Sequence, residues 1–135
     1  HVQLAALFEG CGIPILAGRF PECVEHFRFG AGHDYSRPRV QEADARFNTS
    51  HAVVGYMVAK HWKLPDYVCE AVHLHHDSMI KEGRVAALVA ILQLATHLYN
   101  LHGMKDDSDW LTHRDSALAA LDMHEHDLAD MEEHL

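Results

Sequence analysis

The sequence predicts an all-α fold, a compact bundle of helices around one buried helix. Period-2 alternation of apolar and polar residues, the mark of a half-buried strand, is not convincing anywhere along the chain. Glycine and proline fall between segments of helical length. Residues 84–103, RVAALVAILQLATHLYNLHG, are apolar almost all round, which indicates a central helix buried on most sides.

Start and stop residues define the predicted boundaries. Gly10 and Gly30 occupy positions where glycine ends helices, and Pro21 and Pro65 suit the beginnings of others. Residues 48–50, Asn-Thr-Ser, form a capping cluster ahead of the next helix. With apolar periodicity, these signals predict helices at residues 2–9, 13–20, 21–30, 39–47, 51–63, 66–76, 84–103, 115–123 and 125–134, with loops at 31–38 and 77–83.

Two of these predicted helices, at 51–63 and 66–76, each carry a stripe that includes histidine. The first stripe comprises His51, Val54, Val58 and Trp62. The second comprises Val68, Val72 and His75, with Cys69 and His76 beside it. Gly55 lies on the same side as the first stripe, where glycine costs about 1 kcal/mol relative to alanine. A close helix–helix contact would account for it.

The net charge of −9 is unevenly distributed. Residues 1–103 carry 9 Lys/Arg against 10 Asp/Glu, whereas residues 104–135 carry two basic residues against ten acids. An acidic segment repels phosphate backbones and anionic lipid, so neither nucleic acid nor a membrane is an expected partner. We assign residues 1–103 to a helical core and residues 104–135 to acidic closing helices of the same domain.

The remaining bulk features are typical of one cytosolic domain. A chain of 135 residues can bury one core. Three cysteines, Cys11, Cys23 and Cys69, cannot all pair and form no CxxC motif, so reduced buried thiols are expected. No uninterrupted apolar run reaches the roughly 18 residues of a membrane span. The opening HVQLAALFEG lacks the features of a signal peptide, and we expect domains upstream in a larger protein.

Three of the fourteen histidines, His51, His75 and His76, end apolar stripes at a helical phase that faces inward. Neutral imidazole is a good ligand for transition metals, so these three are candidate metal ligands. Buried histidines that only make hydrogen bonds are the alternative. Eight others have no supporting constellation and are expected at the surface or in ordinary core: His33, His61, His97, His102, His113, His124, His126 and His134.

Residues 50–77 resemble the signature of the HDOD domain family, relatives of the HD and HD-GYP phosphohydrolases. The matching residues are His51 and Gly55, followed by HWKLPDYVCEAVHLHH, which fits W-x-L-P and A-[IV]-x-x-H-H. LAALFEGCGIPIL is similar to the stretch that bears the family's His-Asp pair, and the later helices are similar to those that follow. The resemblance thus covers nearly the whole chain, as the later part of an HDOD domain, and implies an HD-like helical bundle.

The resemblance also indicates which metal ligands are missing. Aligned on Gly12, the His-Asp pair falls on Glu9 and Gly10, and the later aspartate of the hydrolases falls on Thr96. His51, His75 and His76 persist, with Glu9 as a substitute carboxylate. A binuclear hydrolytic site needs a bridging carboxylate and an activated water, so this metal motif is degenerate.

The resemblance implies a non-catalytic regulatory domain of a bacterial, cytoplasmic signal-transduction protein that interacts with a partner or senses a ligand. Other signalling domains or proteins are its expected partners, and a homodimer is a further expectation. No cofactor is expected beyond a weakly bound divalent metal. The alternative is a metal-dependent phosphohydrolase that uses Glu9, His51, His75 and His76, with Asp77 as an additional acid. A pH or redox sensor, using the histidines or Cys69, is a third class.

Overall fold

The computed structural model describes residues 1–21, 45, 49–77, 83–105 and 107–134, and these contain helices and no strand. The all-α prediction is confirmed. The helices are α1 (Val2–Glu9), α2 (Gly12–Arg19), α5 (His51–His61), α6 (Asp66–Leu74), α7 (Gly83–His102), α8 (Ser108–Ala120) and α9 (Glu125–Glu133). Apart from residues 21 and 45, the helices predicted at 21–30 and 39–47 lie outside the described residues. So do the loop at 31–38, with His33, Cys23, and most of the loop at 77–83.

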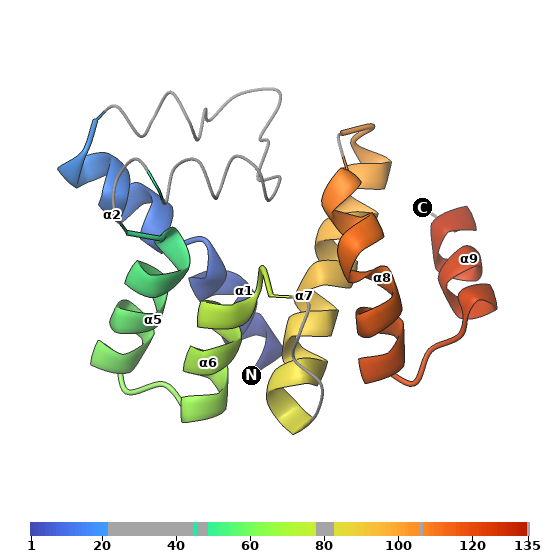
Figure 1. Cartoon of the computed structure of the whole chain (residues 1–135), viewed down its shortest axis with the longest axis horizontal. Coiled ribbons are helices and arrows are strands. Elements are labelled where there is room, and N and C mark those ends of the chain that lie inside the picture. Colours follow the sequence, from blue (N-terminus) through green and yellow to red (C-terminus); the bar gives the residue numbers. More distant parts are fainter. Residues whose placement is uncertain (22–44, 46–48, 78–82, 106, 135) are drawn as a thin grey trace.

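Helix α7 is the central element (Figure 1), with α1 and α6 packed on one side and α8 on the other. Two apolar clusters meet on it. The first joins α1, α6 and α7 through Ala5, Val68, Ala71, Leu88, Val89 and Leu92. The second joins α7, α8 and α9 through Ala90, Leu94, Trp110, Ala117, Leu118 and Leu128. Because both sides of α7 are covered, its sequence is apolar all round, as predicted.

By length and composition α7 could also cross a membrane, since its most apolar 18-residue window has a mean hydropathy of 1.3. About 44% of that window is buried inside the protein. The core helix of a soluble protein has these same properties.

Helices α5 and α6 form a hairpin beside α1 and α2 (Figure 1). A third buried apolar cluster lies between α1, α5 and α6 and consists of Phe8, Ala59, Cys69 and Val72. The contact predicted at Gly55 is confirmed, because an added Cβ would lie 3.1 Å from the Phe8 carbonyl oxygen and 3.1 Å from Val72 Cγ1. Trp62 is less buried than its stripe indicated: it is 68% exposed and makes a T-shaped contact with the Phe8 ring.

Helix α8 begins at Ser108, seven residues before the predicted helix at 115–123. The polar composition of residues 108–114 concealed this first part, whose inward face consists of Trp110 and His113. Trp110, His113 and Ala117 lie on one face of the helix at helical spacing, and all three are buried. Cys69 is free and fully buried, as predicted, and Cys11 is free and half-buried.

Candidate metal centre

His51 is placed by the first turn of α5. The Ser50 hydroxyl oxygen accepts hydrogen bonds from the backbone N–H groups of Ala52 (3.0 Å) and Val53 (3.3 Å), so the predicted capping cluster acts through Ser50. His51 is therefore the first residue of α5, and it is 2% exposed. Its backbone lies directly against Gly12, where an added Cβ would be 2.0 Å from the His51 carbonyl oxygen. Only glycine permits this approach of α2 to α5.

His75 and His76 lie just beyond α6, which ends at Leu74 rather than at the predicted residue 76. A turn follows, in which the Asp77 N–H donates to the Leu74 carbonyl at 2.8 Å. Gln93 of α7 fastens this turn, since its Nε2 donates to the carbonyl oxygens of His75 (3.1 Å) and Asp77 (3.3 Å). Adjacent residues in a turn can both point the same way, which a regular helix does not allow.

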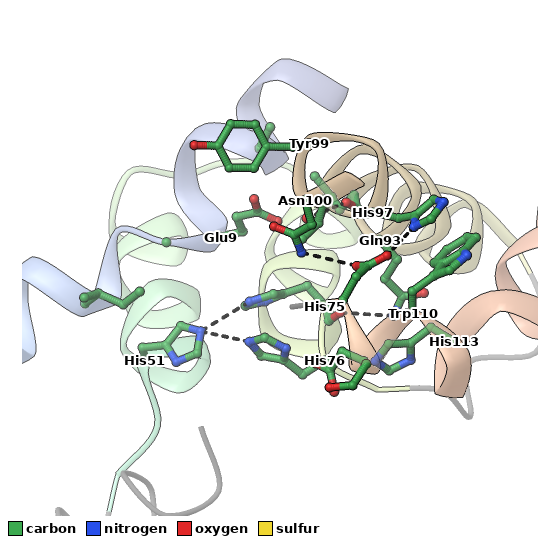
Figure 2. A pocket seen from close by; sticks show the side chains of 18 of the residues that line it. Glu9, His51, His75, His76, Gln93, His97, Tyr99, Asn100, Trp110 and His113 are labelled. Atoms are coloured by element: carbon green, nitrogen blue, oxygen red, sulfur yellow. Dashed lines mark hydrogen bonds and ion pairs between the residues drawn. The ribbon is translucent and has the colours of Figure 1, made fainter. Parts of the chain in front are cut away.

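The three imidazoles converge on one point. His51 Nε2 lies 3.3 Å from His75 Nε2 and 3.1 Å from His76 Nε2, and the candidate ligand atoms of the three residues all lie within 4.8 Å of one another. Figure 2 shows the His51 ring facing the other two across the gap between α5 and the end of α6. The structure thus brings together the three histidines that the sequence selected.

The protonation states suit metal binding. His75 Nδ1 lies 2.7 Å from the Val72 carbonyl, which can only accept, so Nδ1 carries the proton and Nε2 presents a lone pair. Burial lowers the pKa of His75 to about 4, partly offset by this hydrogen bond, and nearby His113 lowers it further. Burial, then the proximity of His75, lowers the pKa of His51 to about 3. Near neutral pH both rings are neutral, the form that binds metal.

Three converging imidazole nitrogens fit zinc, nickel, copper, cobalt or ferrous iron better than magnesium or calcium. The hydrogen bond from His75 to Val72 is the type of outer contact that orients metal-ligating histidines. The residues present therefore fit one transition-metal ion, which His51, His75 and His76 would hold where they line a cavity.

That cavity has a volume of about 360 Å³ and lies between the histidines and the facing walls of α1, α2, α7 and α8. The three positions that the resemblance assigned to lost ligands, Glu9, Gly10 and Thr96, all line it. Gly10 has no side chain, and the Thr96 hydroxyl donates to the Leu92 carbonyl of its own helix at 2.9 Å. Asp77, the additional acid of the hydrolase alternative, is not part of the lining.

Glu9 lies in the cavity wall but outside the cluster of three histidines. Burial raises the pKa of Glu9 to about 7, so its carboxyl group holds a proton to near neutral pH. Its role as a substitute ligand remains a prediction.

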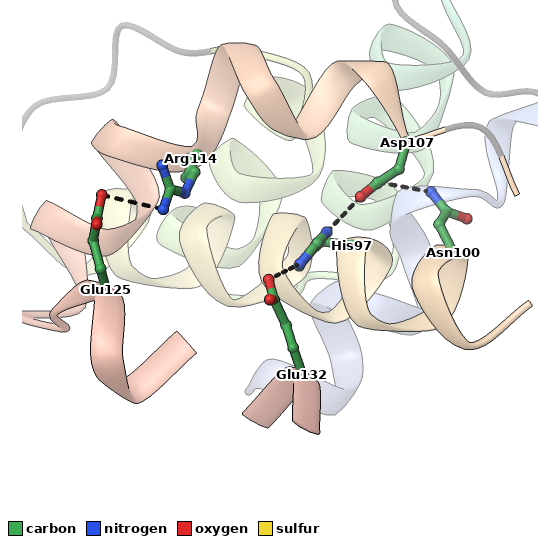
Figure 3. A network of polar contacts seen from close by, with 6 residues as sticks. All are labelled: His97, Asn100, Asp107, Arg114, Glu125 and Glu132. Carbon is green, nitrogen blue, oxygen red and sulfur yellow. Dashed lines mark hydrogen bonds and ion pairs between the residues drawn. The ribbon is translucent and has the colours of Figure 1, made fainter. Parts of the chain in front are cut away.

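The wall opposite the histidines holds a polar group that sequence reasoning missed (Figure 3). His97, 6% exposed, contacts the Asp107 carboxylate through Nδ1, and Asn100 Nδ2 donates to the other oxygen of Asp107 at 3.3 Å. The His97 ring is stacked on Trp110, with centroids 4.4 Å apart and 10° between planes. No sequence signal joins these residues, because their contact depends on how the turn after α7 brings α8 back.

Fold and site together define an all-helical domain in which a histidine-lined cavity lies among α1, α2, α7 and α8. The family model described as the HDOD domain matches residues 1–78, more than half of the chain, and this chain belongs to the HDOD domain family. The match includes His51, His75 and His76 and ends before α7. Comparison with curated proteins and with solved structures gave no match.

Proposed function

We propose that this chain is a regulatory HDOD domain without catalytic activity, which senses a ligand or binds a partner in a bacterial, cytoplasmic signal-transduction protein. One observation carries the proposal. Gly10 and Thr96 line the cavity beside the three histidines, yet neither offers a carboxylate to hold a second metal ion. A binuclear hydrolase needs carboxylates at such positions to bridge its metals and hold the attacking water.

The cavity, without the carboxylates of a hydrolase, is suited to binding a small ligand. A cavity of about 360 Å³ lies within the range that holds small ligands, and its walls combine apolar side chains with polar groups that could orient a ligand. Other signalling domains or proteins are the proposed partners, and self-association into a homodimer is part of the proposal. The acidic segment 104–135 argues against nucleic acid and anionic membranes as partners.

A weakly bound single metal ion is compatible with this function. His51, His75 and His76 would hold it, with Glu9 as a carboxylate in the same cavity wall. When bound, such an ion would supply Lewis acidity and lower the pKa of a coordinated water. The convergence of three Nε2 atoms is therefore also the observation that favours the second candidate, a metal-dependent phosphohydrolase with an atypical site.

Metal content and turnover separate the two candidates. Protein purified without a histidine tag is dialysed against Mn²⁺, Ni²⁺, Fe²⁺ or Zn²⁺, analysed for bound metal, and assayed with bis(p-nitrophenyl) phosphate. We expect no turnover and at most weak metal binding, which His75→Ala abolishes and His73→Ala, an exposed residue of α6, leaves intact. Stoichiometric metal together with turnover that His75→Ala removes would overturn the regulatory proposal.

A gain-of-ligand variant sharpens the test. Gly10→Asp is sterically open, since an added Cβ there meets no atom within 4 Å, and Thr96→Asp replaces the second missing carboxylate. The double variant should bind metal at least about tenfold more tightly than the native chain, because two anionic ligands join the three imidazoles. Unchanged affinity in the folded double variant would contradict the assignment of these two positions.

A further inference from the structure

Helix α9 has few attachments to the other described parts of the protein. Of its nine residues, all of which the structure describes, Leu128 alone is buried, at 3% exposed, against the cluster between α7 and α8. Two polar contacts supplement it: Glu132 Oε1 with His97 Nε2 at 2.9 Å, and the ion pair of Glu125 with Arg114 at 3.1 Å. Figure 3 shows both pairs reaching α9 from neighbouring helices. Such a helix lies at the low-stability end of a fold.

One of these attachments leads directly to the cavity. His97 belongs to the cavity wall, and its ring joins two carboxylates, Asp107 on the cavity side and Glu132 on α9. Its Nδ1 contacts a carboxylate oxygen of Asp107, and its Nε2 lies 2.9 Å from Glu132 Oε1. The ring is also held flat against Trp110, another wall residue. Its orientation is therefore determined jointly by the cavity wall and by α9.

We propose that α9 is a latch whose docking is controlled by what occupies the cavity, with His97 as the connecting residue. An occupant that displaces Trp110 or takes up the Asp107–Asn100 pair turns the His97 ring and breaks its contact with Glu132. Among the described residues, Leu128 and the exposed Arg114–Glu125 pair then remain to hold α9, so the helix undocks more often. This inference rests on the proposed function, because it identifies the element that would report occupancy to a partner.

A side chain built into the cavity can stand in for the unidentified ligand. Gly10 lines the cavity, its backbone is right-handed helical, and an added Cβ meets nothing within 4 Å, so Gly10→Trp places an indole there. Gly18→Trp is the matched control: the position is equally open but does not line the cavity. Ala6→Trp, a second filler from an exposed wall position on α1, serves if Gly10→Trp does not fold.

The measurement is amide hydrogen exchange of residues 125–134 in the full chain. Glu132→Gln should speed exchange about tenfold, the effect of a lost charge-assisted hydrogen bond, while Glu133→Gln, its exposed neighbour, should not. Gly10→Trp should also speed it several-fold, and Gly18→Trp should not. In the Gly10→Trp/Glu132→Gln double variant the effects should not add, because both break the same contact.

Two results would overturn the latch: a folded cavity-filled variant with native exchange in α9, or full additivity in the double variant. Discovery of a hydrolytic activity would instead overturn the proposed function and leave these exchange rates unchanged, since the occupant here is a side chain. The two failures are thus distinguishable.

Discussion

Replacing Gly12 with alanine should displace His51, because Gly12 is the residue on which the α2–α5 contact depends. An added Cβ would lie 2.0 Å from the His51 carbonyl oxygen, 2.8 Å from its carbon and 2.9 Å from its Cα. Real Cβ contacts stay beyond about 3 Å, so α2 and α5 must separate by at least about 1 Å. All three contacted atoms belong to backbone, which cannot rotate away as a side chain can.

The expected cost follows from this geometry. Overpacking costs about 1–3 kcal/mol, and an unyielding backbone neighbour places Gly12→Ala at or above the upper end. At roughly 3–5 °C per kcal/mol for a chain of this length, the melting temperature should fall by about 10 °C or more. Alanine's higher helix propensity acts in the opposite direction, by at most about 1 kcal/mol.

Gly10→Ala is the matched control, two residues away. Its added Cβ meets nothing within 4 Å, and its φ of −93° and ψ of −4° are accessible to alanine. Its free energy of unfolding should stay within about 0.5 kcal/mol of the native value. Urea denaturation followed by circular dichroism compares the variants. If Gly12→Ala proved as stable as Gly10→Ala, the close contact that positions His51 would be refuted.

Three further predictions concern stability and the histidine cluster. The free energy of unfolding of the metal-free protein should be greatest at about pH 6.5–7. The low pKa values of His51 and His75 cost stability as the pH falls below 6.5, whereas the raised pKa of Glu9 costs stability as the pH rises from 4.5 toward 7. The slope is about 1.4 kcal/mol per pH unit for each proton by which the unfolded and folded states differ. Urea titrations from pH 4.5 to 8 measure this, and stability that rises on acidification from pH 6.5 would contradict it. Gly55→Ala should destabilise by about 1 kcal/mol, less than Gly12→Ala, since its 3.1 Å contacts need only a small shift; thermal melting tests this, and an equal loss would count against it. Gln93→Leu should weaken Zn²⁺ binding about tenfold in calorimetry, because it releases the turn that carries His75. Gln3→Leu, at an exposed position of α1, is the control, and native affinity of Gln93→Leu would argue against this role.

Most helices and the cap at Ser50 could be predicted from the sequence, because each depends on neighbours within one or two helical turns. A glycine inside a helix also favoured a close contact at Gly55, but its partners, Phe8 and Val72, lie on other helices and came only from the structure. The HDOD family was likewise evident from one continuous stretch. The start of α8 was missed for the same reason, since residues 108–114 are locally polar and only their packing on α7 reveals Trp110 and His113 as an inward face.

The sequence alone also selected His51, His75 and His76, but their convergence was decided by the tertiary structure. Their contacts span 24 and 25 residues, and they require the glycine approach of α2 to α5 and the Gln93 bonds across to α7. The contact between His97 and Glu132 spans 35 residues and had no local signal. Local patterns determine which residues face inward, whereas the meeting of inward faces depends on how distant helices pack, which no short window of sequence contains.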